Sequence, residues 1–342
     1  MSTTNSAAGL QALTSSAPQV AASKLTGYLD ALVNELRLKA PRALLEGDMS
    51  AIHETRVCTR RLNAAIDLLL PVVSKSDAKA FGRTLKKIRR ALGNLRDMDV
   101  MGGHLNDLGK RQRSLKSSGV WLSARLKEQR DDAMRKSADP VSAVKLVGKL
   151  SAWTDLRRQL DESAGAIDTL LTESLHLQID TFSEQADQVV AQFRDANPAT
   201  RHDPHELRIT GKALRYTLEM AREEGHDLPG GLFKAFKALQ EHLGLWHDFV
   251  VLADWCVTTA SQQTLSHFDP DAHARVLDVA KASLKKCRSE LDAFSALWTE
   301  QGQNLSDQIR RAFPLTQPAI PVALTTDPPT TPREASASPD PV

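Results

Sequence analysis

The sequence predicts an all-α protein built from two halves of similar design. Between about residues 20 and 313, apolar residues recur every three or four positions, prolines are sparse, and no run alternates with a period of two. Two motifs also recur in the same order at nearly the same spacing. The chain has 342 residues, of which 41% are hydrophobic, so it is long enough for two compact domains. Each half has enough helical sequence for about four helices.

Composition divides the chain into five segments. Residues 1–20 are rich in Ser, Thr and Ala, and we predict that they are disordered. The two helical-bundle repeats then occupy residues 21–138 and 161–313, with a connecting segment at 139–160. Residues 314–342 contain eight of the sixteen prolines and few large apolar residues, which predicts a Pro-rich disordered tail.

The internal repeat is the clearest organisational signal. HETRVCTRRLNAAIDLL, from His53, aligns with HELRITGKALRYTLEMA, from His205, at an offset of 152 residues. Downstream, LGNLRDMDV, from Leu92, aligns with LGLWHDFVV, from Leu243, at an offset of 151 residues. The matched pairs are His53 with His205, Glu54 with Glu206, Arg56 with Arg208, Arg60 with Lys212, Gly93 with Gly244 and Asp97 with Asp248. Two motifs in the same order at one spacing indicate duplicated units.

Each copy of the first motif places its cations on one face of a helix. His53, Arg56 and Arg60 lie within an arc of about 60°. In the second copy the arc is about 80° and contains His205, Arg208, Lys212 and Arg215. The apolar residues lie roughly opposite and are predicted to face the core: Leu62, Ile66 and Leu69 in the first copy, and Leu207, Leu214, Leu218 and Ala221 in the second. The basic stripes therefore face water, or a partner element across a wet groove.

The helix that follows each motif repeats this arrangement. In FGRTLKKIRRALG, the cations Arg83, Lys86, Lys87 and Arg90 share one face, opposite Phe81, Leu85, Ile88 and Leu92. The second half is less basic, with Lys234 and Lys237 followed by Glu241. Like charges on one face repel one another, so repeated stripes are better explained by a polyanion than by solubility. For any one helix taken alone, an ordinary solvated face remains the alternative.

A histidine at the start of a helix is well placed to bind an anion, because the free backbone N–H groups and the positive end of the helix dipole attract negative charge there. At the second copy, Asp203 is a good N-cap and Pro204 suits the first helical position. The alternative is that His53 and His205 are capping or packing residues. Glu54, Glu206, Asp97 and Asp248 could hold the cationic groups in position. Alternatively, Asp97 and Asp248 are N-caps after a helix break marked by glycine.

The doubled pattern H-x-x-R-V/I-x-x-R/K, then LG-x-x-R/H-D-x-x-V, resembles the CHAD family, the conserved histidine α-helical domain. The resemblance covers about residues 20 to 313. It implies two pseudo-symmetric four-helix bundles that face each other across a basic groove or channel. It also implies binding of inorganic polyphosphate, association with polyphosphate granules, and no catalysis by the domain itself. Carried over by position, the anion-binding residues are His53, Arg56, Arg60, Arg61, Arg83, Lys86, Lys87, Arg90, His205, Arg208, Lys212, Arg215, Lys234 and Lys237.

Three departures from the repeat make the second half the poorer predicted binder. Ala213 stands where the first half has Arg61, Glu241 stands against Arg90, and His247 replaces Arg96. The ExExK motif of the triphosphate-tunnel domain, to which some relatives are fused, is not found. The chain is therefore expected to be the binding domain without an enzyme, a cofactor or a metal.

Two other functions stay open. A nucleic-acid-binding helical protein would use the same stripes, although only Tyr216 lies beside them for stacking on bases. An HD-type metal-dependent phosphohydrolase would use His202-Asp203 or His247-Asp248, but the first half has Arg96-Asp97 at the second of these positions. A granule-coating helical protein is a further alternative that no sequence feature tests.

Charge and cysteine usage point to a cytoplasmic protein that acts through local charge. The net charge is +2, so attraction of the whole molecule to nucleic acid or membrane is weak. The three cysteines are far apart and contain no CxxC pair, which is typical of reduced thiols. Neither a secretory signal nor a membrane-inserting segment is expected, because the longest apolar run, LLLPVV, is far too short.

Overall fold

A computed structural model of the protein describes residues 23–194, 203–262 and 270–315. Within these ranges every regular element is an α-helix or a short 3-10 helix, which confirms the all-α class. The elements are α1 (Lys24–Leu45), α2 (Met49–Leu69), α3 (Lys75–Ala91), α4 (Gly93–Arg111), η1 (Arg113–Leu115), α5 (Lys116–Ser137), α6 (Pro140–Gly148), η2 (Lys149–Ala152), α7 (Trp153–Glu162), η3 (Ala164–Ala166), α8 (Ile167–Arg194), α9 (Pro204–Glu224), α10 (Leu232–Ala260) and α12 (Pro270–Ala312). The predicted disordered segment 1–20 and nearly all of 314–342 lie outside the described residues.

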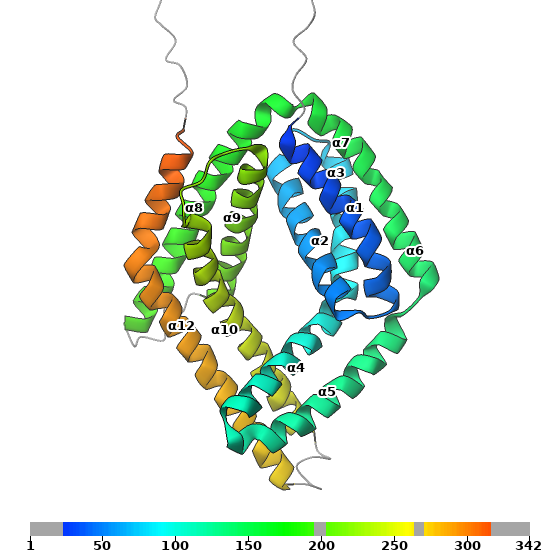
Figure 1. The fold of residues 1–342 in the computed structure, drawn as a ribbon, viewed down its shortest axis with the longest axis vertical. Coiled ribbons are helices and arrows are strands. Elements are labelled where there is room, and N and C mark those ends of the chain that lie inside the picture. Colours follow the sequence, from blue (N-terminus) through cyan, green and yellow to red (C-terminus); the bar gives the residue numbers. More distant parts are fainter. Residues whose placement is uncertain (1–22, 195–202, 263–269, 316–342) are drawn as a thin grey trace, which may run out of the picture.

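The first group of helices is built around α1, α2 and α3. α1 packs along α2, and α3 covers another side of α2 (Figure 1). The segment predicted as a connection, 139–160, is helical and packs on α1 and α3 through buried Leu150, Trp153 and Leu156. The Trp153 indole donates to Asp30 over 2.6 Å, which fixes α7 against α1.

The second group consists of α8, α9 and parts of α10 and α12 (Figure 1). Phe182 of α8 is its aromatic centre, with ring centroids 5.2 Å from Phe236 and 5.4 Å from Trp298.

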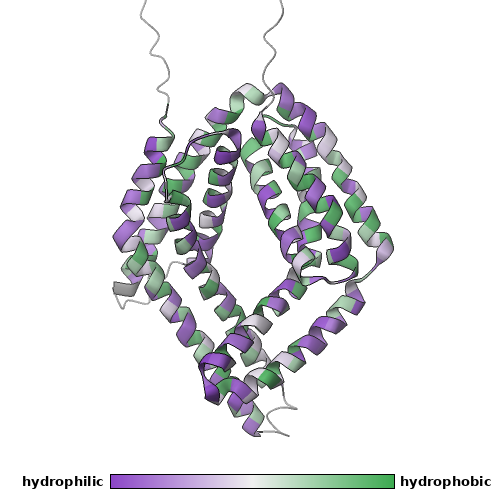
Figure 2. Ribbon diagram, viewed as in Figure 1, coloured by the Kyte–Doolittle hydropathy of each residue, from purple (hydrophilic) through white to green (hydrophobic). Residues whose placement is uncertain are grey.

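Hydrophilic and hydrophobic residues are mixed along each helix, as expected for amphipathic helices that each bury one face (Figure 2). No described helix has the length and hydrophobicity needed to cross a bilayer.

A second hydrophobic core joins the two groups. α4 and α5 form a hairpin that meets α10 and α12, and Leu105 and Leu122 pack there with Phe249 and Cys256. The long helices α10 and α12 therefore contribute to both cores. This arrangement holds α4 beside α10 and α2 beside α9, so the two copies of each motif face one another (Figure 1).

Local chemistry explains where the motif helices begin and end. The Asp48 carboxylate accepts from the Ala51 N–H over 2.7 Å and caps α2, and Asp203 accepts from the His205 N–H over 2.8 Å and caps α9. α9 ends at Gly225, whose φ of 119° favours glycine. His205 is therefore the second residue of α9, at the helix start as predicted. His53 is the fifth residue of α2 and lies in the second turn, beyond the free N–H groups of the helix start.

Close packing under α9 gives a first testable consequence. A Cβ built on Gly211 would lie 2.8 Å from the Phe182 ring, whereas one on Gly82, inside α3, meets nothing within 4 Å. We expect Gly211→Ala to destabilise the protein, because overpacking a core costs about 1–3 kcal/mol and the gain in helix propensity offsets only about 1 kcal/mol. The matched control Gly82→Ala should stabilise slightly. Thermal unfolding followed by circular dichroism checks both, and a Gly211→Ala protein as stable as the wild type would contradict the packing described.

Candidate anion-binding site

The two halves meet around a pocket of about 320 Å³ enclosed by α2, α4, α9 and α10. Its lining consists of His53, Arg56, Val57 and Arg60 from α2, Arg96, Asp97, Val100 and Met101 from α4, Arg208 and Lys212 from α9, and Gly244, His247, Asp248 and Val251 from α10. Four arginines and Lys212 face two carboxylates, so the pocket carries a net positive charge whether or not Lys212 is protonated. Within the described ranges, no tryptophan, tyrosine or phenylalanine lines it.

The pocket brings together positions that the sequence repeat matches. Arg56 and Arg208 both line it, as do Arg60 and Lys212, and Asp97 and Asp248. The helix faces follow the sequence pattern, because Leu62 on α2 and Leu207 and Leu214 on α9 are buried in the core. The cations on the opposite faces of α2 and α9 therefore point into the pocket between these two helices.

Both pocket carboxylates lie among cations rather than at helix ends. Asp97 lies inside α4 and Asp248 inside α10, which runs through Gly244 without a break, so neither is an N-cap. Removal from water raises the pKa of Asp97, and the charge of Asp248 adds to this effect while that of Arg56 opposes it. Asp248 also faces His104, with 3.7 Å between Oδ2 and Nε2. The carboxylates thus offset part of the repulsion in each half.

The pocket cations are crowded enough to lose proton affinity. Burial, with the charges of Arg208 and Arg60, lowers the pKa of Lys212 to about 6. Burial and neighbouring Arg60 likewise lower the pKa of Arg56 to about 10, and burial also lowers the pKa of Arg208. Arg56 is anchored by a hydrogen bond from Nη1 to the Arg89 carbonyl oxygen, 2.9 Å away. Such a site is poised for an anion, whose charge would remove the repulsion.

The two histidines of the motif differ in their relation to the pocket. Partial removal from water and the charge of Arg96 lower the pKa of His53, which lines the pocket. His205 is not among the lining residues, but its ring centroid lies 5.3 Å from that of His247. Burial and the charge of Arg208 lower the pKa of His247 to about 4, so this imidazole is neutral at physiological pH.

Two predicted binding residues share one carboxylate within the protein. The Arg61 Nε lies 2.8 Å from a Glu219 oxygen, and the Arg215 Nε lies 3.4 Å from the other. The Arg215 guanidinium also lies over the Tyr216 ring, 5.0 Å from its centroid, and Tyr216 is buried. Glu219 is separated from Arg61 by 158 residues, so no local pattern indicated this pairing.

The cations of the following helices lie elsewhere. Arg83 and Lys87 line a different hollow, of about 410 Å³, together with Lys149 of η2, while Lys86 and Arg90 are exposed. On α10, Lys234 and Lys237 are exposed, and Lys237 lies 3.5 Å from Glu241. Of the other two predicted carboxylates, Glu54 pairs with Lys39, and Glu206 is exposed in the first turn of α9.

Sequence reasoning left three residues of this region out of the predicted binding set. Arg96 and His247 line the pocket directly before Asp97 and Asp248, so the second motif contained the signal. Adjacent residues differ by only 100° around a helix, so both residues of each pair, Arg96 with Asp97 on α4 and His247 with Asp248 on α10, can line the same pocket. His104 has no comparable signal, since its role depends on α4 lying beside α10.

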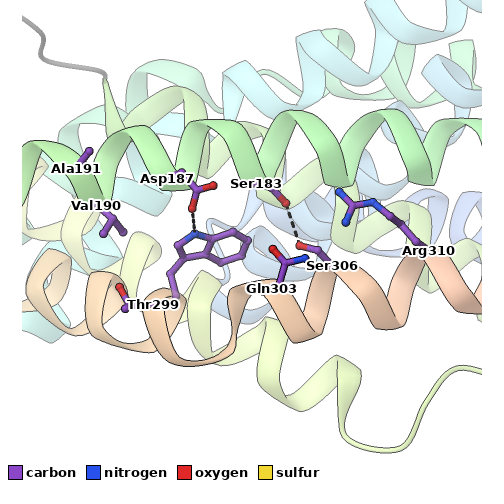
Figure 3. Close-up of a pocket in the computed structure, with 9 residues that line it drawn as sticks. Ser183, Asp187, Val190, Ala191, Thr299, Gln303, Ser306 and Arg310 are labelled. Carbon is purple, nitrogen blue, oxygen red and sulfur yellow. Dashed lines mark hydrogen bonds between the residues drawn. The ribbon is translucent and has the colours of Figure 1, made fainter.

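Other hollows and groupings contrast with this site. Figure 3 shows a hollow of about 510 Å³ between α8 and α12, where the Trp298 indole donates to Asp187 over 2.7 Å. Its one cation, Arg310, lies 2.6 Å from Asp180.

Across the part of the chain that the structure describes, no group of three or more His, Cys, Asp or Glu could hold a metal ion. A further hollow of about 430 Å³ at η1 is lined by the cations Lys110, Arg111, Arg113 and Lys116. The pocket between the motif helices differs from it because its cations come from both copies of the motif.

Comparisons with known proteins agree with the motifs. A family model described as the CHAD domain matches residues 27–257. The crystal structure of the CHAD domain from the plant Ricinus communis is similar in fold, with a TM-score of 0.54 and 21% identity over 86% of this chain and 91% of that one. PptA from Streptomyces chartreusis is similar with a TM-score of 0.56 and 16% identity, over 82% of this chain and all of that one (100%). No curated protein matches the chain. Because the family match covers more than half of the chain and contains both copies of the two motifs, this protein belongs to the CHAD family.

Proposed function

We propose that the protein binds inorganic polyphosphate in the pocket between α2, α4, α9 and α10. The observation that carries this proposal is the convergence of Arg56, Arg60, Arg208 and Lys212 from the two copies of the first motif, which lie 152 residues apart in the chain. Polyphosphate binding is what the resemblance to the CHAD family implies, and membership of that family supports it.

A linear polyphosphate matches the chemistry of this lining. Each internal phosphate carries about one negative charge and offers oxygens but no base. Arginine binds such oxygens through paired N–H donors, and each charge-assisted hydrogen bond contributes about 1.5–3 kcal/mol. Among the described residues, no Trp, Tyr or Phe lines the pocket, which favours a polymer without bases over single-stranded nucleic acid.

Binding without catalysis is part of the same proposal. Asp97 acts on Arg56, and both Asp248 and Asp97 act on Arg208, so both carboxylates serve the pocket cations. Neither is placed in a group that could also hold a metal ion among the described residues. Association with polyphosphate granules and a cytoplasmic location belong to the proposal as well, and they rest on the family resemblance alone.

The test is a competition between two polyanions. The protein is mixed with labelled long-chain polyphosphate, and unlabelled polyphosphate or single-stranded DNA of equal charge concentration is added at 2 salt levels. We expect polyphosphate to compete far better than DNA. Contacts from five cations should also make the affinity fall with salt, with a slope of about −3 to −4 in a double-logarithmic plot. Stronger competition by DNA would overturn the proposal in favour of nucleic acid.

A further inference from the structure

Lys212 occupies an unusual position among the pocket cations. It lies on α9 one turn after Arg208, and it lines the pocket opposite Arg60 of α2. No ion pair or hydrogen bond of its ammonium group is found within the described residues, in contrast to Arg61 and Arg215, which share Glu219. The position is therefore electrostatically unfavourable for a charged side chain until an anion enters.

Charged or titratable groups from each pocket helix face Lys212. Arg56, Arg60 and His53 come from α2, Arg96 and Asp97 from α4, Arg208 and Arg215 from α9 itself, and His247 and Asp248 from α10. α8 packs on another side of α9 and contributes the Phe182 ring against Gly211. Asp248 is the carboxylate that acts most strongly on Lys212, but it also faces Arg208. The cations thus outnumber the carboxylates available to them.

Lysine is the group among these cations that can relieve the repulsion. Arginine does not lose its proton in proteins, whereas a buried lysine does so readily. Burial and the two nearest arginines lower the pKa of Lys212 to about 6, so the amine is mostly neutral at neutral pH. At the equivalent position the first half has Arg60, which keeps its charge. The two halves therefore differ in one titratable cation.

We propose that Lys212 takes up a proton when a phosphate chain enters the pocket, so that binding is coupled to proton uptake at this side chain. This inference rests on the proposed function and adds a regulatory property to it. The phosphate oxygens supply the negative charge that Asp97 and Asp248 cannot supply to every cation. They favour the charged ammonium, which then becomes a further contact to the chain.

The sign of the pH dependence follows from linkage. The bound state holds the proton to a higher pH than the free state, whose Lys212 has a pKa of about 6. The affinity therefore rises as the pH falls from the bound pKa towards 6, by up to about tenfold per pH unit, and becomes constant below that. His247, with a pKa of about 4 in the free protein, contributes only at lower pH or if the chain also charges it.

The experiment is calorimetric titration of long-chain polyphosphate at pH 7.5 in 2 buffers with different ionisation enthalpies, using the full chain. For the wild type we expect an uptake of about one proton per site beyond that of Lys212→Arg, which keeps a permanent charge. Protonation of the chain ends is common to both proteins and cancels in the difference. His247→Asn serves as the control for the imidazole and should retain the uptake.

Each outcome has a distinct meaning. If the wild type does not bind polyphosphate, the proposed function fails and the question of protons does not arise. If the wild type binds and takes up no more protons than Lys212→Arg, the proton coupling fails and the proposed function stands. If His247→Asn abolishes the uptake while Lys212→Arg retains it, the imidazole is the coupled group and the assignment to Lys212 is overturned. Lys212→Met, which removes the charge, should lose both the uptake and the pH dependence.

Discussion

Arg56→Glu combined with Arg208→Glu should weaken the binding of long-chain polyphosphate by at least ~100-fold, since each arginine contributes about 1.5–3 kcal/mol and its replacement repels the chain. Both residues line the pocket, and they occupy matched positions in the two copies of the first motif. The reversal places two carboxylates beside Asp97 and Asp248, so the centre of the pocket becomes acidic. Fluorescence anisotropy with labelled polyphosphate at fixed salt measures the loss.

Two comparisons separate a local effect from a change in total charge or a loss of fold. Lys127→Glu combined with Arg288→Glu changes the net charge equally, but both residues are exposed and lie outside the pocket. This control should bind within a few-fold of the wild type. Arg56→Gln with Arg208→Gln is the milder pair, and it keeps hydrogen-bonding groups near the Arg89 carbonyl that Arg56 contacts. Equal binding by the charge-reversed pocket variant and the wild type, with helical content unchanged, would show that the pocket is not the site.

Chain length should have an effect of similar size. The pocket of about 320 Å³ holds only a short stretch of polymer, while Arg83 and Lys87 of α3 line a separate hollow with Lys149. A long chain can contact both regions at once, which raises the effective concentration for the second contact and increases affinity by ~100-fold or more over triphosphate. Competition experiments with triphosphate and with chains of increasing length measure this ratio.

Variants of α3 identify the source of the length effect. Arg83→Glu with Lys87→Glu should lower the affinity for long chains several-fold and leave that for triphosphate unchanged. Lys234→Glu with Lys237→Glu makes the same change on the exposed face of α10 and tells whether these predicted residues take part. Triphosphate that binds as tightly per molecule as a long chain would contradict the idea that the polymer reaches beyond the pocket.

Helical periodicity and the repeat were enough to predict the all-α class and the core faces of the motif helices. They could pair Arg56 with Arg208 and Asp97 with Asp248, because matched positions in a duplicated pattern have similar surroundings. Periodicity gives the face of a helix on which a residue lies, but not what that face meets in space. For this reason Arg83 and Lys87 were grouped with the motif cations, although they line a different hollow.

Long-range contacts decided the remaining differences. Glu219 pairs with both Arg61 and Arg215, and His104 reaches Asp248 only because α4 packs beside α10. The low pKa of Lys212 likewise depends on Arg60 from the other half. Such effects depend on the relative placement of helices far apart in the sequence, which no spacing within one helix records.

The most direct test of polyphosphate binding in this pocket is a crystal structure of the protein with a short linear polyphosphate of defined length. We expect phosphate groups between α2 and α9, with oxygens within hydrogen-bonding distance of Arg56, Arg60, Arg208 and Lys212. Phosphates bound on the outer face of α3, or on any other surface while the pocket contains only water, would contradict it.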